Sequence, residues 1–189
     1  MSPADPRAGE VLAFWFQGSG RDRRWFQKDD AFDQQIRTRF LDAYDAAAKG
    51  ALETWKADAR ACLALVIVLD QFPRNMFRGT ARAFAADGLA LEAAKAVVGC
   101  GYDLGFSPVE RMFAYLPFEH AESLAEQERA CELTKPLEAF PETDDAYRYA
   151  LAHRAIIARF GRFPHRNAVL GRASTAEEAE FLRGPGSSF

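Results

Sequence analysis

The segment from Cys62 to Leu69, CLALVIVL, carries no polar side chain on any face. An element that is apolar all round is buried on every side, so this run lies at the centre of whatever fold the chain adopts. Its β-branched Val66, Ile67 and Val68 would also suit a central parallel strand. A parallel sheet needs other strands of this kind, and the chain contains no comparable run. The run therefore predicts a central, buried helix.

Most other long segments show helical spacing or helix caps. Phe32, Ile36, Phe40 and Tyr44 form one apolar stripe, which Asp29 or Asp30 can cap at its start and Gly50 can end. Further helices are expected in five segments. They are residues 87–99, capped by Asp87; a segment that begins at Ser107 and Pro108 and is interrupted at Pro117; residues 118–135; a segment from Thr143 or Asp144 to Phe160; and a short segment after a capping box of Ser174 with Glu177. The expected fold is all-α, with about eight helices in stacked hairpins and no significant sheet.

Length and composition favour one ordinary globular domain. The 189 residues suit a single all-helical domain over 1–183, followed by a short Gly, Pro and Ser tail over 184–189 that is expected to be mobile. The formal net charge of −3 argues against nucleic-acid binding, which needs a basic face. The apolar run at 11–16 is too short for a membrane span, so no membrane partner is expected. The three cysteines are widely spaced, which is typical of reduced thiols and predicts a cytoplasmic protein.

A short phrase occurs twice, each time after an apolar stretch. Each copy offers a proline that is expected to end a helix, a phenylalanine to anchor the turn in the core, an arginine, and an asparagine in a left-handed or capping conformation. The residues are Phe72, Pro73, Arg74 and Asn75 in the first copy and Phe163, Pro164, His165, Arg166 and Asn167 in the second. The phrase therefore predicts two turns that each aim an arginine.

Several longer motifs resemble a known family. They are VLAFWF, WFQKDDAFD, LDQFPRNMFRGTARAFAAD, PFEHAESLAEQE and RFGRFPHRNAVLGRASTAEEAEFL. Over residues 11–183 the chain resembles the bacterial family catalogued as domain of unknown function 924. The resemblance implies an all-α fold similar to tetratricopeptide-repeat proteins, and it implies no catalytic residues. Folds of this kind usually bind peptides, although a fold does not decide a function.

The arginines of the two turns have two possible uses. One is a buried network of salt bridges, in which Arg74 and Arg166 pair with Asp70, Asp87, Glu119 or Glu122. The other is an anion site, because guanidinium groups match carboxylates and phosphates in bidentate fashion. The chain lacks both Gly-rich phosphate-loop motifs, which disfavours a nucleotide. The spacing of Glu119, Glu122 and Glu126 is typical of a solvated surface stripe.

These polar residues define one candidate ligand-binding face. Its members are Asp70, Arg74, Asn75, Arg78, His120, Glu122, His153, His165, Arg166 and Asn167. The expected ligand is a peptide end or a small anion, with no cofactor. No His-Glu-x-x-His or paired-cysteine spacing occurs, so no metal is expected. The alternative is a hydrolase-type enzyme, in which His120 or His153 is the general base and Arg74 and Arg166 hold an oxyanion. Whether the protein is an enzyme, and its oligomeric state, stay open.

Overall fold

The computed structural model describes residues 5–18 and 25–187, and along these residues every regular element is helical. The α-helices are α1 (Pro6–Trp15), α2 (Asp30–Ala48), α3 (Ala59–Val66), α4 (Phe72–Met76), α5 (Asp87–Gly99), α6 (Pro108–His120), α7 (Leu124–Thr134), α8 (Ala146–Phe160) and α9 (Ala176–Phe181). No strand occurs in these residues, so the all-α prediction is confirmed. The last two residues of the expected tail, 188 and 189, lie outside the described residues.

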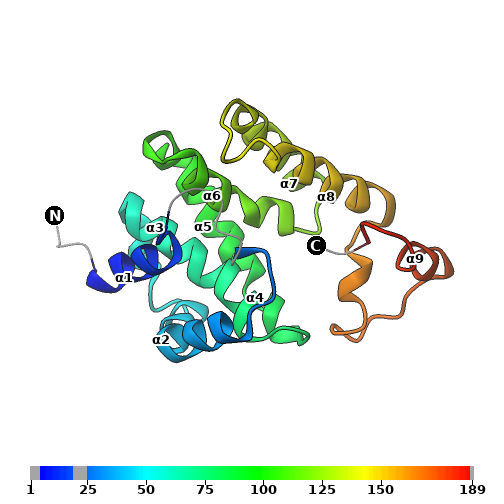
Figure 1. Ribbon diagram of the computed structural model, residues 1–189, viewed down its shortest axis with the longest axis horizontal. Coiled ribbons are helices and arrows are strands. Elements are labelled where there is room, and N and C mark those ends of the chain that lie inside the picture. Colours follow the sequence, from blue (N-terminus) through cyan, green and yellow to red (C-terminus); the bar gives the residue numbers. More distant parts are fainter. Residues whose placement is uncertain (1–4, 19–24, 188–189) are drawn as a thin grey trace.

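Consecutive helices pack against each other from α5 to α8, whereas α1 packs on α3 and α2 packs on α4. Helices α5, α6, α7 and α8 contact one another in sequence order, while α3 packs on α1, α5 and α6. In Figure 1, α7 and α8 run side by side along one edge, with α1 to α4 on the other side of α5 and α6. No helix in the described part of the chain is both long and apolar enough to cross a bilayer. The three cysteines are free thiols, as expected.

The central apolar run is the buried helix that its composition predicts. Every residue from Cys62 to Leu69 is buried. Pro73 does not end this helix, contrary to the sequence-based expectation. A π-helical turn, η3 (Ile67–Gln71), joins α3 directly to α4. In η3 the Phe72 N–H bonds the Ile67 carbonyl, five residues back. This wider turn relieves the clash that Pro73 would make with the carbonyl four residues before it, so the chain stays helical.

The predicted break at Pro117 is also wrong. Helix α6 continues through Pro117 to His120, and the chain breaks at residues 121–123 instead. The Gln127 side chain explains the position of this break, because its Nε2 donates to the carbonyls of Glu119 and Ala121, at 2.6 and 2.8 Å. These bonds satisfy carbonyl groups that the end of α6 leaves without partners.

The caps differ in detail from the sequence-based expectations. Asp87 is the first residue of α5, and Ala86 stands at its N-cap. The capping box of α9 lies one residue later than expected and pairs Thr175 with Glu178. At the start of α6 the predicted Ser107 cap is confirmed.

The second Phe-Pro-Arg turn is closed by a glycine. Gly161, at φ 69°, ends α8, and Pro164 begins the 3-10 turn η7 (Pro164–Arg166). Neither Asn75 nor Asn167 is left-handed, because no non-glycine residue described has a positive φ. Glycine tolerates that conformation at little cost, so the turn does not need an asparagine there.

Candidate functional site

The centre of the site is Asp70, which the π-helical turn η3 places in the core. Its carboxylate lies 2.7 Å from His120 Nδ1 and 3.3 Å from Arg74 Nη1, and it accepts a hydrogen bond from Gln71 Nε2. Burial alone would raise the pKa of this carboxyl, but Arg74 and His120 together hold it below its usual range. Asp70 is therefore ionised and binds groups from α4 and α6.

A second carboxylate joins the two Phe-Pro-Arg turns. Arg74 donates to both oxygens of Asp87, through Nη1 at 2.9 Å and Nη2 at 3.1 Å. Arg166 Nη1 donates to Asp87 Oδ2 and to the His120 carbonyl, each at 3.1 Å. The expected network of Arg74 and Arg166 with Asp70 and Asp87 is therefore present. It links α4, α5, the end of α6 and the turn η7.

Asp70 sets the tautomer of His120. Because the carboxylate is ionised, Nδ1 carries the proton and Nε2 keeps its lone pair. Burial lowers the pKa of His120, and the charge of Arg74 lowers it further against the opposing effect of Asp70. The ring is consequently neutral near pH 7. Within the described chain no group hydrogen-bonds Nε2.

A hollow of about 410 Å³ opens beside this network. Its walls come from the 3-10 turn η4 (Ala81–Phe84), the start of α5, the connection between α6 and α7, and the segment after η7. Asp87, His120, Glu122 and Arg166 supply polar groups to it, and Phe84 is among its apolar lining. The hollow therefore presents titratable and apolar groups together.

Arg166 has an unusual environment for a cation. The residue is 6% exposed, and its guanidinium carbon lies 4.7 Å from the ring centre of Phe84 and 4.4 Å from that of Phe163. Its Nε is buried and has no hydrogen-bond acceptor in the described chain. Burial, and then the charge of Arg74, lower the pKa of Arg166 to about 10, so it stays protonated at pH 7. A buried donor without an acceptor costs free energy.

Behind the hollow lies a second group of buried titratable residues. His153 on α8 donates through Nδ1 to the Tyr149 carbonyl at 2.8 Å, and the same atom is 3.5 Å from Glu119 Oε2. The ring centres of His120 and His153 are 6.2 Å apart. Burial and then the charge of Asp70 raise the pKa of Glu119 to about 8. Burial and then the charge of His120 lower the pKa of His153 to about 3.

The surface-stripe interpretation of Glu119 is therefore wrong. Glu119 is 1% exposed and faces α8, while Glu122 and Glu126 follow on a different segment. Because α6 continues through Pro117 and breaks only after His120, the i, i+3, i+7 spacing does not describe one continuous helix face. The break could not be located from the sequence, since Pro117 was the stronger signal.

The remaining predicted site residues make contacts elsewhere in the structure. Asn75 and Arg78 both bind Asp33 on α2, away from the hollow. Asn167 bonds Ser174 at 3.0 Å and Glu178 at 3.3 Å. His165 does not line the hollow; its Nδ1 is buried without a partner in the described residues, and burial, with the charge of Arg166, lowers its pKa to about 4.

Glu122 lines the hollow, but its carboxylate is already occupied. It accepts hydrogen bonds from Arg172 at 2.6 and 2.9 Å and from the Phe163 N–H at 2.8 Å.

Among the described residues, no three His, Cys, Asp or Glu side chains are grouped so that they could hold a metal ion.

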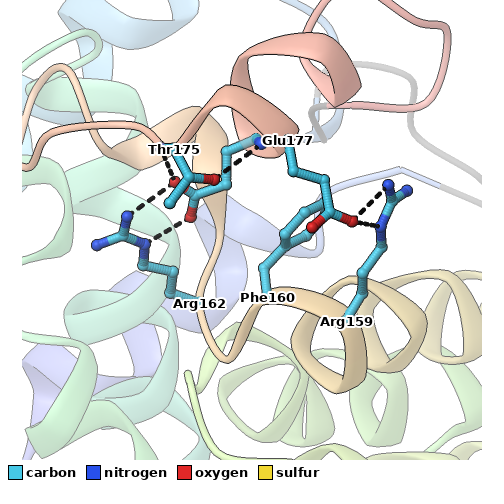
Figure 2. A pocket seen from close by; sticks show the side chains of 6 residues that line it. Arg159, Phe160, Arg162, Thr175 and Glu177 are labelled. Atoms are coloured by element: carbon cyan, nitrogen blue, oxygen red, sulfur yellow. Dashed lines mark hydrogen bonds and ion pairs between the residues drawn. The ribbon is translucent and has the colours of Figure 1, made fainter.

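A second hollow lies where α8 meets α9, and its charges cancel. Figure 2 shows Arg159 facing Glu177. Arg162 donates to both carboxylate oxygens of Glu178, at 2.6 and 2.8 Å. Thr175 also contacts Glu178 through the capping box. Each arginine there donates to a carboxylate through Nε, whereas Arg166 uses only Nη1, so this hollow attaches α9 to α8 and offers less to an anion than the hollow at Arg166.

Comparison with known proteins supports the fold and leaves the activity open. A solved structure of a protein of unknown function from Agrobacterium tumefaciens superposes with a TM-score of 0.87 at 44% identity, covering 95% of this chain and 98% of that one. No curated protein matches the chain. The model of the family described as bacterial protein of unknown function, DUF924, matches residues 11–186. This chain therefore belongs to the DUF924 family of bacterial proteins.

Proposed function

We propose that the hollow beside His120 and Arg166 binds a small anionic ligand. The observation that carries this proposal is Arg166, a buried guanidinium that lines the hollow and hydrogen-bonds the described chain through Nη1 alone. Its other contacts are with the rings of Phe84 and Phe163. Nη2 donates no hydrogen bond in the described chain, so this nitrogen of the guanidinium is available to an anion.

The other walls suit a ligand with an anionic end and an apolar body. His120 offers an acceptor at Nε2, because Asp70 holds the proton on Nδ1. Phe84, Leu91 and Leu170 supply apolar surface. The volume of about 410 Å³ is within the range of small-molecule sites, so a metabolite or the carboxylate end of a peptide would fit.

A melting-temperature screen tests this function. Small carboxylates and phosphates at millimolar concentration are added to the parent protein at constant ionic strength, and a ligand that binds only the folded state raises the melting temperature by mass action. We expect at least one anion to stabilise the parent protein and Arg166→Met to lose that response. Arg159→Met is the matched control, because Arg159 lies in the second hollow. Equal responses in both variants, or no response to any anion, would contradict the proposal.

One observation favours a second candidate, a hydrolase-type enzyme in the same hollow. The 2.7 Å contact between Asp70 and His120 Nδ1 orients the ring so that Nε2 can accept a proton from water, while Arg166 would stabilise a developing oxyanion. Between the two histidines considered, His120 is the better base, because it lines the hollow and His153 does not. A panel of simple esters tests this: turnover should be abolished by His120→Gln and retained by His153→Gln.

The helical-repeat likeness and the cytoplasmic location stay predictions. Sequential packing of α5 to α8 is compatible with a helical repeat, and the free thiols are compatible with a reducing compartment. The proposed ligand site depends on neither.

A further inference from the structure

We propose that the anionic group of the ligand is a phosphoryl group, held between the N-termini of α5 and α7 together with Arg166. This inference rests on the proposed function and names its ligand class. Both helix starts border the hollow, through Asp87 and Gly88 of α5 and through Ser123 before α7. The independent observation is the buried Arg166, which lines the same hollow and leaves Nη2 without a hydrogen bond in the described chain.

The N-terminus of α5 has free backbone donors. Ala86 stands at the N-cap and has no side-chain oxygen, so it makes no capping bond. The first backbone bond of the helix runs from the Ala90 N–H to the Ala86 carbonyl. The N–H groups of Asp87, Gly88 and Leu89 precede it and have no acceptor within the helix. Such a helix start attracts anions through these donors and through the helix dipole.

The N-terminus of α7 is similar. Ser123 occupies the N-cap, but its hydroxyl makes no capping bond to the helix. The first backbone bond runs from the Gln127 N–H to the Ser123 carbonyl, so the N–H groups at 124–126 lack helical acceptors. A Ser N-cap ordinarily bonds the second or third N–H of its helix. Its hydroxyl is therefore a further donor at the hollow.

Donors that come from two helix ends and one guanidinium suit a tetrahedral group. A phosphate monoester presents three acceptor oxygens and close to two negative charges near pH 7, whereas a carboxylate presents two oxygens in one plane. The two carboxylates at the hollow do not oppose this, because each is held by guanidinium groups. Asp87 is held by Arg74 and Arg166, and Glu122 by Arg172.

Gly88 provides a substitution that blocks the site with little effect on the fold. It lies in the first turn of α5, lines the hollow, and a Cβ built there meets no atom within 4 Å. Gly99 ends the same helix, is equally open, and does not line the hollow. Replacing either glycine by leucine raises helix propensity, so the two variants differ in position and not in chemistry. Gly88→Asp is a second test, since a carboxylate in the first turn stabilises the helix and repels a bound anion.

The test is calorimetric titration with three probes: inorganic phosphate, phenyl phosphate and benzoate, at one ionic strength set with sodium chloride. We expect the parent protein to bind phenyl phosphate about tenfold or more tightly than benzoate. Gly88→Leu and Gly88→Asp should each weaken the binding of phenyl phosphate about tenfold or more, and Gly99→Leu should bind phenyl phosphate as tightly as the parent does. Circular dichroism and melting confirm that all variants are folded.

Each other outcome has a distinct meaning. If benzoate binds as well as phenyl phosphate and both are lost in Gly88→Leu, the phosphoryl assignment is overturned and the small-anion function stands. If both Gly88 variants bind phenyl phosphate normally, the site does not involve the start of α5 and the inference is overturned. If the parent binds none of the probes and no anion shifts its melting temperature, the proposed function itself fails.

Discussion

Replacing Glu119 by glutamine should stabilise the protein, and more so at alkaline pH. Glu119 is 1% exposed, its Oε2 makes no hydrogen bond in the described chain, and its neighbour Asp70 is ionised. Burial and the charge of Asp70 raise its pKa from 4.5 to about 8. The folded protein therefore keeps the proton on Glu119 up to about pH 8, while the unfolded chain releases it above about pH 4.5. Stability is consequently lost as pH rises between these values.

The magnitude follows from linkage. With 1.36 kcal/mol per pKa unit, a folded pKa of about 8 against 4.5 lowers the free energy of unfolding by about 3 kcal/mol at pH 7. The loss grows from about 2 kcal/mol at pH 6 to about 5 kcal/mol at pH 8.5. Glutamine has the same shape and no charge to release. The difference in stability between Glu119→Gln and the parent should therefore increase by about 2–3 kcal/mol over this interval.

Urea unfolding at several pH values, followed by tryptophan fluorescence, measures this difference. Glu138→Gln, which removes an exposed carboxylate, is the matched control. Its free energy of unfolding should change with pH in the same way as that of the parent. The reasoning is refuted if the Glu119→Gln and parent curves are parallel between pH 6 and 8.5. That result would mean that Glu119 ionises normally in the folded protein.

Three further predictions concern the same network. Asp70→Asn strands buried cationic donors and should lower the free energy of unfolding by about 3–5 kcal/mol in urea unfolding, and a loss below about 1 kcal/mol would contradict its structural role. Burial lowers the pKa of His120, and lowers those of His153 to about 3 and His165 to about 4, so the unfolded chain binds protons that the folded protein does not. In the Glu119→Gln variant, which lacks the opposing titration of Glu119, stability should accordingly fall as pH drops below about 6.5 in acid titrations, and a stability that is flat from pH 6.5 to pH 5 would disagree. Gly161→Ala should cost about 1–2 kcal/mol, because φ is 69° there, whereas a melting temperature equal to that of the parent would show that the turn relaxes.

The helical fold follows from features that act locally. The stripe of Phe32, Ile36 and Phe40, the Ser107 cap and the all-apolar run each determine a helix through neighbouring residues, and each prediction is confirmed. Where helices end depends on tertiary contacts. Pro73 stays inside a helix because a π-helical turn accommodates it, and α6 ends where the Gln127 side chain satisfies its carbonyl groups.

The candidate site could be predicted only in part, because local motifs indicate some of its residues and tertiary contacts decide which of them meet. The likeness of the two Phe-Pro-Arg phrases points to Asp70, Arg74 and Arg166, which do meet around Asp87. It also suggests equivalent roles for Asn75 and Asn167, and the structure gives them unrelated partners. The hollow itself, with its two helix starts, arises from elements far apart in the chain, so no local pattern indicates it.

The most direct test of the account is a nitrogen-15 NMR titration of the Arg166 side chain with inorganic phosphate at constant ionic strength. Arg166→Lys assigns its Nε–H resonance, and Arg159 and Arg162 serve as internal controls, because both already bind carboxylates. The account predicts a saturable shift of the Arg166 Nε–H, accompanied by shifts of the backbone amides of Gly88 and of residues 124–126, with the two control resonances unchanged. A titration in which Arg166 and these amides stay fixed, or move only as much as Arg159 and Arg162, would contradict the claim that this hollow binds a phosphoryl group.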